Sequence, residues 1–132
     1  MTSDSEEFDE YVQDALDLIE FANGPVNSKW GALRAKMGHP ESFGLDMISV
    51  GNEQWESQYV DLYKRHQIFE KAIHEKYPDM RILGTAGPFL DSPITEDAWK
   101  FYNNEFKANP NTCYAVDEHY YVSPQWMYDH VD

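Results

Sequence analysis

The stretch MISVGNEQW occupies residues 47–55. Its first four residues suit a buried strand, and Gly51 then interrupts the apolar run. An amide, a carboxylate and a large aromatic side chain follow at once, as Asn52, Glu53 and Trp55. The carboxyl end of a parallel strand is where α/β proteins usually keep their chemistry. The stretch therefore predicts a strand whose end carries functional side chains.

Two more strand-like runs follow, RILGTAG at 81–87 and CYAVDEHYY at 113–121. The three runs start about 33 residues apart, and amphipathic helices expected at 58–77 and from Thr95 separate them, which is the βαβ pattern of a parallel sheet. A (β/α)₈ barrel needs about 250 residues. The predicted fold class is therefore α/β, either a partial (β/α)₈ TIM barrel of about three parallel strands with flanking helices or a small open sheet.

Other helices are predicted on either side of these units. Helical spacing of apolar residues runs to Asn23, and Ser3 with Glu6 suggests a capping box at its start. A shorter helix is expected over 28–38, with Trp30, Leu33 and Met37 on its apolar side. Ser123 and Pro124 then predict the start of a last helix.

Composition restricts the partners. The chain has 132 residues, 42% hydrophobic, which suits one domain or part of one. Its net charge of −14 would repel nucleic acid and anionic membranes, so neither is expected as a partner. An acidic surface rich in aromatic residues suits a neutral sugar. Neither a membrane-spanning stretch nor a secretory signal is apparent, which makes the cytoplasm the default expectation.

No metal or other cofactor is expected. Cys113 is the only cysteine, so an internal disulfide and a cysteine-based zinc site are excluded, and its strand-like surroundings favour a buried thiol over a nucleophile. Asp117, Glu118 and His119 are consecutive on a predicted strand, where side chains alternate between faces, so they cannot all converge on one ion.

Glu53 is the candidate for chemistry. A carboxyl group with apolar strand behind it and Trp55 beside it would be partly desolvated, which raises its pKa. A glutamic acid that is still protonated near neutral pH can give its proton to a leaving oxygen. The alternative reading is a loop glutamate that caps the next helix.

Four blocks together carry a resemblance to a known family: DALDLIEFANGP, WGALRAKMGHP, GNEQW and VDEHYY. They resemble the catalytic domain of α-L-arabinofuranosidases in glycoside hydrolase family 51, within a clan of retaining (β/α)₈ glycosidases. The resemblance implies that residues 1–132 are a fragment of the catalytic barrel, covering its strands four to six. It also implies that Glu53 is the general acid/base and that Asn52 bonds a substrate hydroxyl.

The same resemblance implies further substrate contacts from His119 and Tyr121, while Trp55 could stack on a sugar or simply pack. Strand alternation places Glu118 on the opposite face from these groups, so it is not expected to be the nucleophile. In the family the nucleophile is a glutamate on the seventh strand, which these residues do not include. The isolated chain is therefore expected to be inactive, or nearly so.

The expected substrate is an arabinose-containing oligosaccharide or polysaccharide. Within the clan, an endoglucanase or a xylosidase is the nearest rival, since the Asn-Glu pair is shared. A non-catalytic carbohydrate-binding or assembly fragment is the alternative from another class. Exposed edges of a half barrel would in either case favour self-association.

Overall fold

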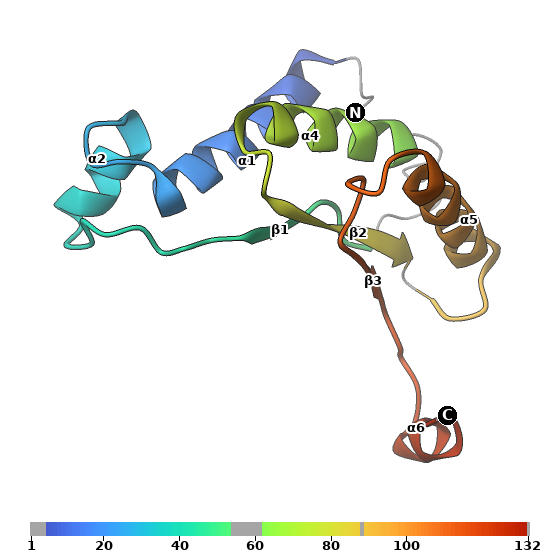
Figure 1. Cartoon of the computed structure of the whole chain (residues 1–132). Coiled ribbons are helices and arrows are strands. Elements are labelled where there is room, and N and C mark those ends of the chain that lie inside the picture. The colour runs from blue at the N-terminus through green and yellow to red at the C-terminus, as the bar shows by residue number, and fades with distance from the viewer. Residues whose placement is uncertain (1–4, 54–61, 88, 132) are drawn as a thin grey trace.

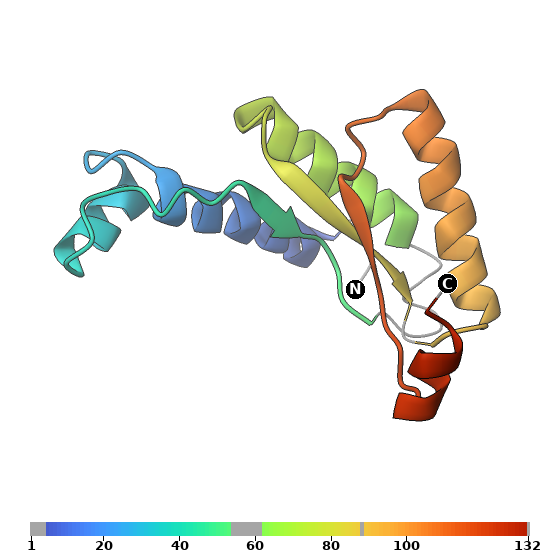
Figure 2. The same cartoon turned by 60° about the horizontal axis from the view of Figure 1, so that its bottom comes forward.

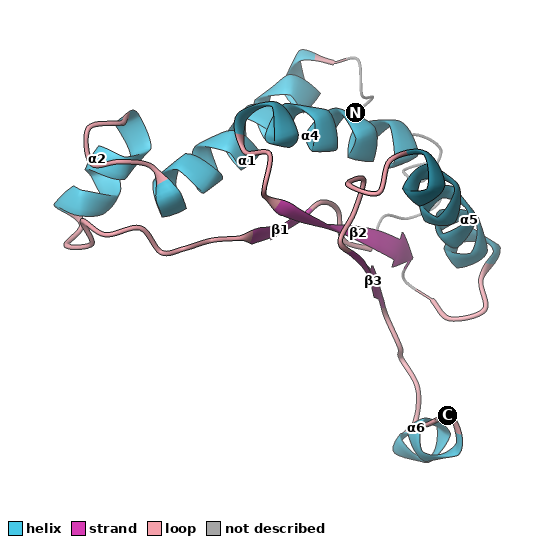
Figure 3. Ribbon diagram, viewed as in Figure 1, coloured by secondary structure: helices cyan, strands magenta, loops and turns pink. Residues whose placement is uncertain are grey.

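The computed structural model describes residues 5–53, 62–87 and 89–131, so Trp55 and Tyr59 lie outside the described residues. Helices and strands alternate along most of the chain (Figure 3). In chain order they are α1 (Glu6–Asn23), α2 (Lys29–Lys36), β1 (Met47–Ser49), α4 (Leu62–Lys76), β2 (Arg81–Gly87), α5 (Pro93–Ala108), β3 (Ala115–Glu118) and α6 (Pro124–Asp129).

The strands form a three-stranded parallel sheet in the order β1-β2-β3. Met47 pairs with Arg81, and Leu83 pairs with Ala115, so β2 is the central strand. The prediction of parallel strands joined through helices is confirmed. The bounds of β2 are as predicted, whereas β1 and β3 are shorter than the runs that suggested them.

Helices α1, α4 and α5 lie on one side of the sheet, as two views of the chain agree (Figures 1 and 2). Two apolar clusters fill the space between helices and strands. One joins Ile19 of α1 and Ile73 of α4 to Ile82 of β2, and the other joins Ala86 of β2 to Tyr102 of α5. Alternate residues of β2 thus point to the helices, which leaves Leu83 and Thr85 on the opposite face.

Serine caps set the starts of four helices. The N-cap of α1 is Ser5, whose Oγ accepts a hydrogen bond from the Phe8 amide. The predicted cap, Ser3, lies outside the described residues. Ser28 and Ser123 cap α2 and α6 as expected. Helix α5 begins at Pro93 after the cap Ser92, earlier than the predicted Thr95. A serine oxygen satisfies an otherwise unpaired amide of the first turn, and this fixes each start.

The predicted apolar side of α2 is wrong for Leu33 and Met37, whereas Trp30 is half-buried. Leu33 and Met37 are 40% and 63% exposed, whereas Gly31 and Arg34 are buried. The Arg34 guanidinium donates hydrogen bonds to three backbone carbonyls, those of Phe21, His39 and Pro40. A buried cation is tolerated when its N–H groups are bonded, so the polar face of α2 turned inward.

Candidate active site

The turn after β1 carries Glu53. The Val50 amide still bonds the Leu83 carbonyl, and the chain then turns through Gly51 at φ 91°. Glu53 itself has φ 43°, in the left-handed region that non-glycine residues seldom occupy. Such backbone costs on the order of 1–3 kcal/mol and is found mostly at functional sites. The carboxylate is thereby aimed by a strained turn rather than by a regular strand.

The end of β3 supplies the facing side chains. Asp117 pairs with Thr85 of β2, which places it on the sheet face away from the helices. Glu118 points the other way, where its Oε1 accepts a hydrogen bond of 2.7 Å from the Trp99 indole of α5. The prediction that strand alternation turns Glu118 toward the helices is confirmed.

Glu53, His119 and Tyr121 meet at the carboxyl end of the sheet. The Nδ1 atom of His119 lies 2.5 Å from Oε1 of Glu53, and the Tyr121 hydroxyl donates to the same oxygen. The side chains of His119 and Glu53 are only 21% and 23% exposed. Residues separated by more than sixty positions thus form one hydrogen-bonded group at the edge where α/β proteins keep their chemistry.

The direction of the Glu53 pKa differs from the expectation. Hydrogen bonds from Tyr121, first, and His119, second, lower the pKa of the Glu53 carboxyl, and desolvation opposes them only in part. The same contact with Glu53, followed by one from Asp117, raises the pKa of His119. Burial alone would raise this pKa, as expected from the sequence, but the hydrogen-bond donors to the carboxylate outweigh burial here. In this chain the contact therefore favours the ionised form of Glu53 and the charged form of His119.

Asp117 was not predicted as part of this group. Its Oδ2 lies 3.0 Å from Nε2 of His119, so the imidazole is held between two carboxylates. The signal was present in the sequence, since residues two apart on a strand share a face. Asn52 is exposed in the turn beside Glu53, and Trp55, predicted to line the site, lies outside the described residues.

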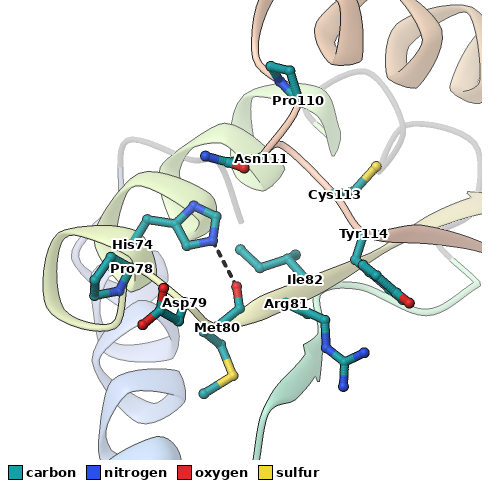
Figure 4. Close-up of a pocket in the computed structure, with 10 residues that line it drawn as sticks. All are labelled: His74, Pro78, Asp79, Met80, Arg81, Ile82, Pro110, Asn111, Cys113 and Tyr114. Atoms are coloured by element: carbon teal, nitrogen blue, oxygen red, sulfur yellow. Dashed lines mark hydrogen bonds between the residues drawn. The ribbon is translucent and has the colours of Figure 1, made fainter.

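Other titratable groups have structural partners. His66 is buried on the apolar side of α4, as predicted, with Nε2 2.7 Å from the Thr112 carbonyl. Cys113 is buried, and desolvation raises the pKa of its thiol, which suits the predicted packing role. His74 bonds the Met80 carbonyl inside a cavity of about 230 Å³ (Figure 4). That cavity lies at the start of β2, away from Glu53.

A parallel sheet with helices on one face and polar side chains gathered at its carboxyl end is typical of the catalytic domain of an α/β enzyme. A family model described as "Alpha-L-arabinofuranosidase 1 domain" matches residues 1–132. The chain therefore belongs to the α-L-arabinofuranosidase family, as the four sequence blocks suggested.

Relatives and solved structures agree with this assignment. The chain is 43% identical over 122 residues to an extracellular exo-α-L-arabinofuranosidase of Streptomyces chartreusis, a match that covers 92% of this chain and 14% of the relative. It is 46% identical over 99 residues to α-L-arabinofuranosidase 1 of Arabidopsis thaliana, covering 71% of this chain and 14% of that protein.

Among solved structures, the arabinose-bound α-L-arabinofuranosidase MgGH51 matches with a TM-score of 0.66 at 29% identity, over 92% of this chain and 17% of the other. A family 51 enzyme from Bifidobacterium longum matches with a TM-score of 0.73 at 18% identity, over 90% and 24% of the two chains, which supports the fold alone.

The chain thus spans about a seventh of the length of these curated relatives. In residues 5–53, 62–87 and 89–131, none of the helices combines the length and the apolar character needed to cross a membrane. The Streptomyces relative is named as extracellular, so the cytoplasmic expectation has no support.

Proposed function

We propose that this chain is a segment of a retaining glycoside hydrolase that removes α-L-arabinofuranosyl residues from arabinose-containing polysaccharides, with Glu53 as its general acid/base. The observation that carries the proposal is the Glu53 carboxylate, held by His119 and Tyr121 at the carboxyl end of a parallel sheet. The segment corresponds to strands four to six of a (β/α)₈ barrel. Membership of the arabinofuranosidase family supports the substrate class.

In this mechanism Glu53 protonates the leaving oxygen and then, as a carboxylate, takes a proton from the attacking water. Asn52, exposed in the same turn, bonds a substrate hydroxyl, and His119 and Tyr121 hold the carboxylate in place. Trp55 remains a proposed sugar contact. The acid step needs a protonated Glu53, and the nearby nucleophile carboxylate of a complete site would raise its pKa by like-charge repulsion.

Among the described residues, neither carboxylate at the end of β3 is assigned as the nucleophile. A retaining enzyme places its two carboxyl groups about 5–5.5 Å apart across the anomeric carbon. Glu118 points to α5, and the ring of His119 fills the space between Asp117 and Glu53, where a sugar would have to lie. These 132 residues alone are therefore expected to be inactive.

The test is Glu53→Gln in a full-length enzyme that carries this segment, assayed on p-nitrophenyl α-L-arabinofuranoside and on arabinan. Loss of general acid/base catalysis should lower kcat/KM on arabinan by roughly 10²- to 10⁴-fold. The loss should be smaller on the aryl glycoside, since nitrophenolate leaves without a proton.

Glu118→Gln is the matched control, because it removes the same charge from the helix side of β3. Equal activity of Glu53→Gln and wild type on arabinan would refute the acid/base assignment. A panel of aryl glucosides and xylosides would reveal an endoglucanase or xylosidase specificity instead.

A non-catalytic sugar-binding fragment is the second candidate. It is favoured by the hydrogen bonds from Tyr121 and His119, which lower the pKa of Glu53 and suit a carboxylate that accepts hydrogen bonds from sugar hydroxyls. Two measurements distinguish the enzyme from the binding fragment: calorimetric titration of this chain with arabino-oligosaccharides, and an assay of their hydrolysis by the full-length protein. Binding to this chain without any hydrolysis by the full-length protein supports the sugar-binding fragment.

A further inference from the structure

Asp117 lies behind the acid/base group rather than in it. Its Oδ2 contacts Nε2 of His119 at 3.0 Å, while Nδ1 of the same ring lies 2.5 Å from Glu53. Asp117 is fixed by its place in β3 opposite Thr85, beside an irregularity in strand pairing between Thr85 and Gly87. Irregularities of this kind re-aim side chains at the ends of strands. The last paired residues of β3 thereby hold one end of a chain of contacts that reaches Glu53.

The hydrogen bonds of His119 limit the protonation state of its ring. Ionised carboxylates only accept hydrogen bonds, so His119 can bond both of them only by donating from both nitrogens. Four titratable groups make up this cluster: Asp117 and His119 at the end of β3, Tyr121 just after it and Glu53 from the turn after β1. Glu118 and Tyr120 bond each other on the opposite face.

We propose that Asp117 is a positioning residue of the acid/base site: by binding Nε2 of His119 it keeps Nδ1 aimed at Glu53 and keeps a proton stored on the His119–Glu53 pair. This inference rests on the proposed function of Glu53. Asp117 acts through His119 and does not itself touch the substrate or transfer the proton.

Within the pair, the stored proton lies either on Nδ1 of His119 or on the Glu53 carboxyl. When Glu53 gives this proton to the leaving oxygen, Glu53 and Nδ1 of His119 are both left unprotonated, and the proton that Glu53 then takes from the attacking water restores the pair. When Glu53 is protonated, it donates to Nδ1 of a neutral ring whose Nε2–H still bonds Asp117. The raised pKa of His119, to which Glu53 and then Asp117 contribute, agrees with this arrangement. Because the groups are coupled, their titration belongs to the pair.

The first experiment is a pH titration of the His119 ring nitrogens by ¹⁵N NMR in this chain. The side chain of Asp117 is 46% exposed, so removal of its charge in Asp117→Asn should lower the apparent pKa of His119 by about one unit, at the low end for a neighbouring charge. Asp117→Ala removes both charge and hydrogen bond and should shift it at least as far. Glu118→Gln, with the same charge change on the opposite face, should shift it far less.

Backbone amide spectra report whether each variant keeps the fold. An apparent pKa of His119 that is unchanged in both Asp117 variants, or that falls as far in Glu118→Gln, would overturn the proposal.

The second experiment measures kcat/KM against pH in the full-length enzyme. Loss of the shared proton sets the basic limb of the profile, so Asp117→Asn should move that limb to lower pH by the same amount as in the NMR titration. Asparagine can still accept from Nε2, and it should therefore keep near-normal activity at the new optimum. Alanine cannot, and should lose about tenfold or more through misorientation of the ring.

The two proposals fail in different ways. Full activity of Glu53→Gln would sink the proposed function even if the His119 titration behaved as expected. If Glu53→Gln is inactive but the basic limb of the pH profile does not move in Asp117→Asn, only the role of Asp117 is refuted.

Discussion

At the scale of single residues, the chain places ionisable groups in two opposite environments. His119 sits between two carboxylates at the surface, and hydrogen bonds raise its pKa. His66 is 1% exposed within the helix layer, and desolvation lowers its pKa. The first environment favours a charged ring and suits chemistry, whereas the second favours a neutral ring and suits packing.

The buried ring predicts a pH dependence of stability. Since the pKa of His66 is lower in the folded state than its ordinary value of 6.5, its contribution to stability is complete above pH 6.5 and is lost as pH falls below that value. Glutamine can still donate to the Thr112 carbonyl but cannot ionise. His66→Gln should therefore show a shallower fall of the free energy of unfolding between pH 6.5 and 5, measured by urea denaturation.

The difference between the free energies of unfolding of His66→Gln and wild type at pH 8 gives the cost in packing of the smaller glutamine side chain. Parallel curves for the two proteins across the acid range would contradict the prediction.

At the scale of elements, close packing decides how α2 meets the end of α1. A Cβ atom built on Gly31 would lie 2.2 Å from the Pro25 carbonyl oxygen and 2.6 Å from that of Gly24. Both are backbone atoms, which cannot swing aside as a flexible side chain would. Gly31 thus allows α2 to approach closely enough for Arg34 to bond the carbonyls of Phe21 and Pro40.

Gly31→Ala tests this packing, because helix propensity and the clash predict changes of opposite sign in the free energy of unfolding. Helix propensity alone predicts a gain of about 1 kcal/mol for alanine over glycine. The clash predicts instead a loss of about 1–3 kcal/mol in the free energy of unfolding. Chemical denaturation should show the loss, and the control Ala32→Gly, at an exposed position of the same helix, should cost about 1 kcal/mol from propensity alone. A stabilised Gly31→Ala would refute the close approach.

At the scale of the whole molecule, the sheet is covered on one side only by the parts that the structure describes. Strands β1 and β3 each pair only with β2 among the described residues, so each presents an outer edge. Exposed apolar side chains elsewhere include Leu18, Val26 and Phe106. Unpaired edges and apolar faces favour association with another copy of the chain.

The isolated chain should therefore form oligomers as its concentration rises, as measured by sedimentation velocity. Ala115→Lys places a charge on the exposed edge strand β3 and should weaken association. Asn103→Lys, which adds the same charge to an exposed position on α5, should not. A monomer at every concentration that melts cooperatively would contradict this expectation.

The order of the elements, the parallel pairing and the family could all be predicted from the amino-acid sequence. These rest on local signals, since apolar periodicity, serine caps and glycine or proline stops each act over a few residues. The sequence also determined that Glu118 and His119 face opposite ways, because side chains on a strand alternate.

Only the tertiary structure decided the electrostatics of the site and the inward face of α2. The pKa of Glu53 depends on donors from Tyr121 and His119, which are far away in sequence. The burial of Arg34 depends on carbonyls of α1 and of the loop after α2. Hydrogen bonds between distant segments leave no periodic pattern in the sequence from which they could be predicted. Their strength depends on distances and desolvation that exist only in the folded chain.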